Sequence, residues 1–239
     1  MDEKTLQEKL KKLEDLERRI QYYEDRQKIE QLMFRYAVNH NQKNMHRTSR
    51  FYAFSQADAA IEITDRGNYV GEKNVRQLFE GNYQIQINEG SYLLHWQSTP
   101  MIEIAADGQT AHGVWLSLGA ETVVNKQGVP VPVWNFIRWV VDFFKEDGEW
   151  KFYHYRVFMD QKSDFDKGWT KDFFHWDFMG KMPGASEDPP SCNYPYSPGG
   201  YIQHVVPSCP EPYDTWTDET WFFSEEPSLN KTKKKKGED

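Results

Sequence analysis

Residues 133–161 contain the feature that most constrains the fold of this chain: two runs rich in aromatic and β-branched residues that flank Asp147-Gly148. An Asp-Gly pair between two such runs is the strongest short-range sign of a β-hairpin. In the second run His154 and Arg156 are two residues apart, so both project from the same face of the strand. A proton-transfer group beside a permanent cation, among Phe, Tyr and Val, predicts the wall of a pocket.

The composition of the 239-residue chain limits its partners. Its 15% content of aromatic residues suits both a β-sheet core and a pocket for a flat apolar ligand. The formal net charge of −8 argues against nucleic acid as a partner, because phosphate binding needs a clustered basic field. No apolar stretch is long enough to cross a bilayer and the N-terminus lacks a signal-peptide core, so we expect no membrane partner and a cytoplasmic location.

Metal, cofactor and disulfide chemistry find little support in the sequence. Cys192 and Cys209 have no neighbouring His or Cys pair that would suggest zinc, and two free thiols in a reducing cytosol are favoured over a disulfide. The chain has no His/Asp/Glu triad at ligand spacing, no Gly-rich phosphate loop and no GxSxG elbow. We therefore expect no metal and no cofactor.

Helical patterns come first along the chain and strand patterns later. Apolar residues at three- and four-residue spacing predict a helix over residues 4–44, with a break near 22–25. The next expected elements are a helical turn at 50–57, a strand at 60–64, a helix at 69–83, strands at 93–104 and 111–124 with a turn at 107–108, and a connection at 129–132. This order indicates an α+β fold with helices on one face of a curved, mainly antiparallel sheet.

Four segments are predicted. Residues 1–24 are expected to form a highly charged amphipathic helix that packs on a partner subunit, in keeping with a homo-oligomer (dimer or trimer). A coiled coil is the alternative for this segment, although its apolar stripe is too short to require one. Residues 25–161 form the main domain. Residues 162–230 are rich in both Pro and aromatic residues, and because disordered segments are normally poor in rings, an ordered C-terminal extension is expected. The basic cluster within residues 231–239 is expected to be a disordered, solvated tail.

A resemblance to a known family rests on four pieces of sequence: IEQLMFRYAVNHNQKN, YVGEKNVRQLFEG, LLHWQSTPMIEIAADGQTAHGVW and EWKFYHYRVF. In order and spacing they resemble the SnoaL-like enzyme branch of the nuclear transport factor 2-like superfamily, over roughly residues 25–161. The resemblance implies a cone-shaped α+β barrel whose curved sheet wraps a long helix around a deep apolar pocket. The superfamily includes scytalone dehydratase, ketosteroid isomerase, polyketide cyclases, bile-acid 7α-dehydratase, a lignin-dimer γ-formaldehyde lyase and also proteins without catalysis.

Among these enzymes, the bile-acid dehydratase pattern aligns best. Its helical Tyr falls on Tyr36 and its last-strand Arg falls on Arg156. Its Asp falls on Asn41 and its strand His falls on Ser98, whereas this chain has His95 three residues earlier. The resemblance therefore implies a related elimination rather than the same reaction on a bile acid.

The candidate catalytic residues are Tyr36, His95, His154 and Arg156. Either His would abstract a proton, since imidazole titrates near working pH, and either could instead be a structural His. Tyr36 and Arg156 would stabilise an oxyanion. The alternatives are a core aromatic for Tyr36 and, for Arg156, an ion pair with Asp142 or Asp160. The expected substrate contacts are His40, Asn41, Trp96, Ser98, Trp115 and Phe158.

Together these features predict a cofactor-independent lyase that acts on a hydrophobic, aromatic or polycyclic, hydroxylated small molecule. Both dehydration and formaldehyde-releasing C–C cleavage fit the same general acid–base chemistry. The alternatives are a ketosteroid-type isomerase or polyketide cyclase in the same pocket, and a non-catalytic module for small-molecule binding or oligomerisation.

Overall fold

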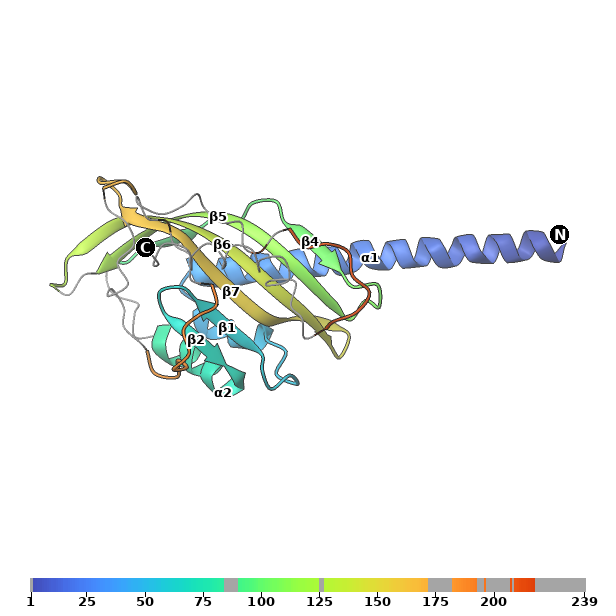
Figure 1. Cartoon of the computed structure of the whole chain (residues 1–239), viewed down its shortest axis with the longest axis horizontal. Helices are drawn as coiled ribbons and strands as arrows, with labels where there is room; N and C mark the ends of the chain where they lie inside the picture. Colours follow the sequence, from blue (N-terminus) through green and yellow to red (C-terminus); the bar gives the residue numbers. More distant parts are fainter. Residues whose placement is uncertain are drawn as a thin grey trace, which may run out of the picture.

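The computed structural model describes residues 2–83, 90–124, 127–171, 182–192, 196, 207 and 209–217. Figure 1 shows a curved sheet and a long helix that runs along it and then projects well beyond it. The predicted tail at 231–239 lies outside the described residues, as does much of the predicted extension at 162–230.

Helix α1 spans Glu3–Asn41 as one uninterrupted helix. The side chain of Asp2 caps its start by accepting a hydrogen bond from the backbone N–H of Thr5 (2.7 Å). The predicted break near residues 22–25 was wrong. That stretch contains neither Gly nor Pro, and it packs against the rest of the molecule through Tyr22 and Asp25, so nothing there favours leaving the helix.

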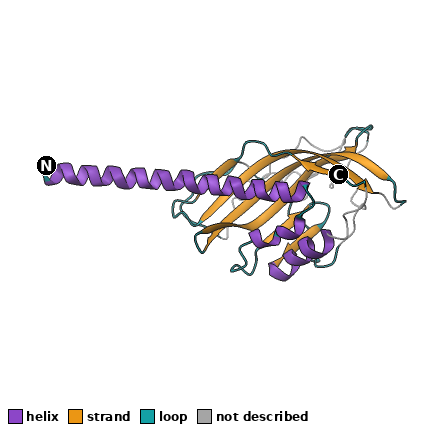
Figure 2. Ribbon diagram, turned by 180° about the vertical axis from the view of Figure 1, so that it is seen from behind, coloured by secondary structure: helices purple, strands orange, loops and turns teal. Residues whose placement is uncertain are grey.

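Within the described residues, seven strands form one open sheet in the order β2-β1-β7-β6-β5-β3, with β4 also paired to β5. The strands are β1 (Ala60–Ile63), β2 (Gly67–Val70), β3 (Leu93–His95), β4 (Met101–Ile104), β5 (Thr110–Val124), β6 (Pro130–Glu146) and β7 (Glu149–Asp164). All pairs are antiparallel except β1 with β7. Helix α1 lies along one face of this curved sheet (Figure 2). The α+β class, the curved mainly antiparallel sheet and the N-terminal helix are confirmed.

Four short helical segments complete the described fold: η1 (Met45–Arg47), η2 (Ser49–Phe51), α2 (Gly71–Arg76) and η3 (Gln77–Asn82), the last a π-helix. The helix predicted at 69–83 begins two residues later than expected, because Tyr69 and Val70 pair with β1. Gly71 makes the change of direction with a φ of 80°, a conformation that residues with a side chain rarely adopt.

The single strand predicted at 93–104 is two strands, β3 and β4, and both pair with β5. His95 lies opposite Gly119 and Met101 lies opposite Val114, so this part of the chain has one residue more than its partner. The surplus residue has to bulge out, and Pro100 has no N–H to donate to a ladder. These two facts explain the interruption.

The predicted β6–β7 hairpin is confirmed. Asp147 and Gly148 have φ values of 51° and 79°, and two positive φ angles are what a two-residue type I′ turn requires. Strand β6 begins at Pro130, inside the segment predicted as a connection, and β7 runs past Gln161 to Asp164.

The core lies between α1 and the face of the sheet that α1 covers, which we call the inner face. Tyr36 is 2% exposed, and its ring centroid lies 4.5 Å from that of Tyr155, 5.8 Å from Phe152 and 6.2 Å from Trp139. Aromatic rings packed at such distances bury large apolar areas. This packing fixes the C-terminal half of α1 on the sheet.

A buried carboxylate also ties α1 to the β6–β7 hairpin. Asp25 accepts hydrogen bonds from Lys145 Nζ and Trp150 Nε1, each at 2.8 Å. Burial by itself raises the pKa of Asp25, but the hydrogen bonds from Lys145 and Trp150 outweigh it and leave the pKa below its ordinary value.

We expect Asp25→Asn to lower the free energy of unfolding at pH 7 by about 2 kcal/mol, because it removes the carboxylate that faces Lys145. Since the pKa is lower in the folded than in the unfolded chain, this contribution is complete above a pH of about 4 and is lost as the pH falls through the folded-state pKa. The difference in urea denaturation between variant and parent should therefore shrink on acidification. The control is Asp15→Asn in the projecting part of α1, and an equal loss there would contradict the assignment.

Candidate functional site

A cavity of about 190 Å³ lies between the inner face of the sheet and the C-terminal end of α1. Ile63, Ile137, Trp139, Val157 and Met159 form its apolar wall. Its polar side is formed by His40, His95, Glu121, Asn135 and Lys162. A small apolar chamber with a few convergent polar groups is the usual form of a small-molecule site.

His95 is placed in this cavity by the end of β3 and by α1. The side chain of Asn41 clamps its backbone, accepting from the His95 N–H (2.9 Å) and donating to the His95 carbonyl (3.1 Å). The ring then folds over Gly119, the residue opposite on β5, where an added Cβ would overlap the imidazole. Glycine at position 119 thus leaves the space that the catalytic candidate occupies.

Glu121 holds the imidazole of His95 from the neighbouring strand. Its Oε1 lies 3.0 Å from His95 Nε2 and 2.7 Å from Asn135 Nδ2, and its Oε2 lies 3.1 Å from Lys162 Nζ. Burial raises the pKa of Glu121, but the positive charge of Lys162 and the hydrogen bond with His95 outweigh it and hold the pKa well below its usual range. Glu121 is therefore a buried carboxylate that stays ionised.

The tautomer of neutral His95 follows from this contact. Because an ionised carboxylate only accepts hydrogen bonds, Nε2 of His95 must carry the proton that lies between them. The lone pair is then on Nδ1, which is buried against Gly119 and has no hydrogen-bond partner in the part of the chain that the structure describes. A His oriented by a carboxylate, with an unused lone pair on its other nitrogen, is the arrangement of a general base.

His40 lies beside His95 but is suited to a different task. The two ring centroids are 5.3 Å apart, and the ring of Tyr36 stacks on the other side of His40 at 5.7 Å. Burial, reinforced by the neighbouring His95, lowers the pKa of His40 to about 3. His40 is thus neutral at working pH and acts as a packing or hydrogen-bonding group.

Two cations, Arg66 and Lys162, and a tyrosine, Tyr83, also line the cavity. Asp65 Oδ2 lies 3.7 Å from Lys162 Nζ, and the guanidinium of Arg66 lies 4.9 Å from the ring centroid of Tyr83. Burial raises the pKa of Tyr83 to about 12 although Arg66 opposes it. Burial likewise raises the pKa of Tyr36, so both hydroxyls remain protonated and able to donate.

The expectation that His154 and Arg156 line the same pocket as Tyr36 and His95 was wrong. They share a strand face, as predicted, but it is the outer face, opposite to the one that α1 covers, because Tyr155 and Val157 take the inner positions of β7. Neither residue lines the cavity. That they share a face was predicted correctly, but the face was assigned wrongly.

On the outer face His154 and Arg156 belong to a second polar network centred on Asp142. This carboxylate is fully buried and lies 2.8 Å from His112 Nδ1, 3.2 Å from His154 Nδ1 and 2.8 Å from an Arg156 guanidinium nitrogen. Burial raises the pKa of Asp142, but Arg156 and the histidines outweigh it, so the pKa lies well below its usual range. The alternative prediction of an ion pair between Arg156 and Asp142 is confirmed, while Asp160 pairs with Arg138 at 2.7 Å.

Four further residues predicted as substrate contacts lie outside the cavity. Trp96 is 61% exposed, and the Ser98 hydroxyl accepts a hydrogen bond from the backbone of β5. Trp115 is buried against Phe143, and Phe158 packs on the outer face. Phe158 was misplaced because it has the same strand parity as His154 and so lies on the outer face. Trp96 and Ser98 were misplaced because they fall in the interruption between β3 and β4. Asn41 acts on the site through the backbone of His95.

The polar and ring-bearing residues of the cavity that were not predicted from the sequence include Lys43, Asp65, Arg66, Tyr83, Glu121, Asn135 and Lys162. Glu121 and Asn135 were within reach of sequence reasoning, because each is a polar residue in a strand of mostly apolar neighbours, at the parity of the inner face. Asp65, Arg66 and Tyr83 come from a turn and a helix end, where no periodicity marks the position.

Other kinds of site find no support in the described ranges. No group of three or more His, Cys, Asp or Glu side chains is arranged there to hold a metal ion. None of the helices described has the length and apolar character needed to span a bilayer. Cys192 is buried and Cys209 exposed, and both are free thiols as predicted.

Comparison with known proteins gives a family match and a set of similar folds. The family model described as a SnoaL-like domain matches residues 21–156. A search of curated proteins finds no significant match. The similar solved structures include the hexachlorocyclohexane dehydrochlorinase LinA-type3 of Novosphingobium barchaimii LL02, with a TM-score of 0.51, 14% identity, and coverage of 61% of this chain and 92% of that one.

A second similar structure comes from Novosphingobium aromaticivorans DSM 12444 and is named as a candidate scytalone dehydratase. Its TM-score is 0.51 at 14% identity, and the match covers 70% of this chain and 98% of that one. At such low identity these two likenesses show the fold alone.

The close fit of His95 over Gly119 gives a direct test of the site. We expect Gly119→Ala to displace the imidazole and to lower the free energy of unfolding by about 1–3 kcal/mol, because the added methyl group overfills a packed position. The measurements are urea denaturation and the ¹⁵N chemical shifts of the His95 ring. Ala120→Ser, on the other face of the same strand, is the control. Unchanged His95 shifts in Gly119→Ala would contradict the described packing.

Proposed function

The chain belongs to the SnoaL-like domain family, and from that premise we propose that it is a cofactor-independent lyase. The proposed substrate is a hydrophobic, aromatic or polycyclic small molecule that carries a hydroxyl group. The proposed reaction is an elimination by general acid–base catalysis, with His95 as the base.

The observation that carries the proposal is the buried hydrogen bond between His95 Nε2 and Glu121 Oε1 (3.0 Å) at the cavity. Buried carboxylates are costly, and this one is kept ionised by Asn135, which donates to the same oxygen as the imidazole, and by Lys162, which contacts the other oxygen. A His95 that served only for packing would not need a buried carboxylate beside it. A His95 that acts as a base benefits from one, because the carboxylate stabilises the imidazolium that forms when the base accepts a proton.

In the dehydration, Nδ1 of His95 takes a proton from a substrate carbon. The electrons of the broken C–H bond form a C=C bond, and the C–O bond to the neighbouring hydroxyl breaks. The leaving hydroxyl takes the proton from Nδ1 and departs as water, which returns His95 to its neutral form. Tyr36, which remains protonated, would donate a hydrogen bond to oxygen as negative charge develops.

The related C–C cleavage uses the same groups. His95 takes the O–H proton of a hydroxymethyl group, the C–C bond to that group breaks, and formaldehyde is released. The electrons of that bond form a C=C bond as a hydroxyl on the next carbon takes the proton from His95 and leaves as water, which returns His95 to its neutral form. The two eliminations differ in which proton of the substrate lies near Nδ1, so the structure of the substrate determines which of them occurs.

The charges around the cavity offset each other in large part. Lys43, Arg66 and Lys162 supply three positive charges and Glu121 and Asp65 supply two negative ones, which leaves one positive charge in excess. Lys43 also donates a hydrogen bond to Ser91. The apolar wall of Ile, Val, Met and Trp suits rings or fused rings. These features support the hydrophobic substrate class.

The test is turnover of a panel of hydroxylated diaryl and polycyclic compounds. Mass spectrometry reports loss of water, a trapping reagent reports formaldehyde, and chromatography reports isomerisation without a change in mass. We expect His95→Gln to lower kcat/KM by roughly 10²–10⁴-fold with an unchanged melting temperature.

His154→Gln on the outer face is the matched control, and its kcat/KM should stay within about threefold of the parent, because a residue remote from the reacting atoms does not contact the transition state. An equal loss in both variants would move the chemistry away from this cavity. Tight binding with no turnover of any compound would favour the non-catalytic module instead, and isomerisation alone would favour the isomerase.

A second prediction concerns Glu121. We expect Glu121→Gln to keep an acceptor for Asn135 but to lower kcat/KM by roughly 10²-fold, since a neutral amide stabilises the imidazolium much less than a carboxylate does. For the same reason the acidic limb of the kcat/KM profile should move to lower pH. Glu103→Gln on β4, away from the cavity, is the control, and an unchanged pH profile in Glu121→Gln would refute the assigned role.

A further inference from the structure

The projecting part of α1 carries an apolar stripe that the described body leaves uncovered. We propose that residues 6–24 pair with the same segment of a second copy of this chain in a parallel, two-stranded coiled coil. The inference does not depend on the proposed reaction, because it rests on a different part of the molecule.

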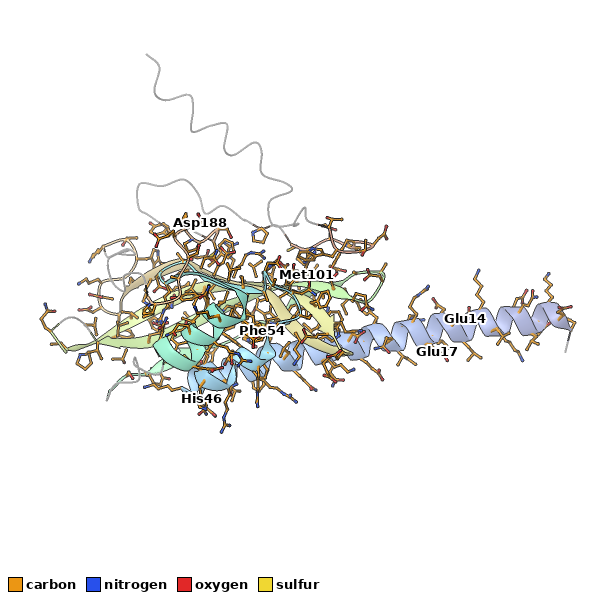
Figure 3. All side chains as sticks on the ribbon, turned by 90° about the horizontal axis from the view of Figure 1, so that it is seen from below. Glu14, Glu17, His46, Phe54, Met101 and Asp188 are labelled. Carbon is orange, nitrogen blue, oxygen red and sulfur yellow. The ribbon has the colours of Figure 1, made fainter. Side chains whose placement is uncertain are left out.

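The stripe is exposed along its whole length. It consists of Leu6, Leu10, Leu13, Leu16, Ile20 and Tyr23, which are each between 44% and 64% exposed. No residue between positions 3 and 24 is buried in the described structure, and this part of α1 stands away from the body, as the labelled Glu14 and Glu17 show (Figure 3). A helix of this length without tertiary packing is only marginally stable in water, so a partner is needed to hold it.

The spacing of the stripe is that of a left-handed coiled coil. Successive apolar residues are four, three, three, four and three positions apart, an average of about 3.4 against the 3.6 residues of a straight helical turn. The two consecutive steps of three around Leu13 shift the heptad register there. Leu13 is therefore position d of the first heptad pattern and position a of the second. Such a shift changes the local winding and is tolerated in natural coiled coils.

The charges beside the stripe match a parallel partner in register. In that arrangement a residue on one flank meets the partner's residue five positions further along the chain, on the facing flank. The three flank pairs that this rule defines are Lys9 with Glu14, Lys12 with Glu17 and Arg19 with Glu24, and every one joins opposite charges.

The antiparallel arrangement that would also align the stripe is disfavoured by the same residues. Centred on Leu13, it would place Lys12 beside the Lys12 of the second copy and Glu14 beside its Glu14. Like charges in these positions repel. The parallel arrangement is therefore the one that the charges select.

The body leaves room for this pairing. Ile29 and Met33, which pack on the sheet, lie sixteen and twenty residues after Leu13, about 160° from it around the helix in either direction. The stripe thus faces away from the side of α1 that holds the sheet. Two copies can meet along it with their bodies on the outside.

The first experiment measures the mass of the full chain in solution by sedimentation equilibrium. We expect the parent to show twice the mass of one chain and Leu10→Lys/Leu13→Lys to show a single mass, with the same thermal stability of the body and the same turnover per chain. Both residues are exposed and Lys favours helix about as well as Leu, so the variant should fold. The control is Glu8→Lys, which adds the same charge on the other side of the helix and should leave the mass unchanged.

The second experiment tests direction and pairing. Lys12→Glu should weaken association by roughly threefold or more, and adding Glu17→Lys should restore it, because the exchanged pair is again complementary. With Cys209→Ser as background, Leu6→Cys should form a disulfide between copies on oxidation, since a parallel pair in register brings the two Leu6 positions together. A monomeric parent, or a Leu6→Cys variant that fails to cross-link while dimeric, would overturn the proposal.

Discussion

The alternation of side chains along the long strands β5, β6 and β7 governs this structure, because it sorts buried charges onto two faces that cannot share partners. Glu121 on the inner face is held by His95 and Lys162, and Asp142 on the outer face is held by residues of its own network. A buried carboxylate without donors is strongly destabilising, so each network fixes the strand register that creates it. Slipping one strand by one residue would exchange the faces and leave both carboxylates without donors.

Two β-bulges modify this alternation and complete the inner site. The pairing of β6 with β7 shifts between Phe136 and Ile137 and again between Asp142 and Phe143. Strict alternation from Val157 and Met159 would turn Lys162 outward, but the extra residue in β7 at Asp160 restores it to the inner face beside Glu121. A bulge depends on the partner strand, so the sequence of β7 alone could not reveal that Lys162 belongs to the site.

The hairpin and the α+β class could be read from the sequence, because local turn chemistry and periodicity determine them. The face of His154 and Arg156 could also have been inferred, since the apolar set Tyr155, Val157 and Met159 occupies the opposite parity and forms the better core face. That parity favours His95 over His154 as the base, because His154 lies on the face opposite to the core. The inner position of Glu121 was readable from its parity, but its contact with His95 was not, because the two residues are twenty-six positions apart on strands whose pairing only the fold defines.

Helix α1 connects the two parts of the molecule for which functions are proposed and is anchored to the sheet between them. At one end Asn41 clamps the backbone of His95, and at the other the apolar stripe is free to meet a second copy. Between them Asp25 and the ring of Tyr36 anchor the helix to the sheet through an ion pair and close aromatic packing. Association would set how the bodies are arranged and how stable the projecting part of the helix is, while Asn41 and Glu121, the residues that orient His95, both belong to the body.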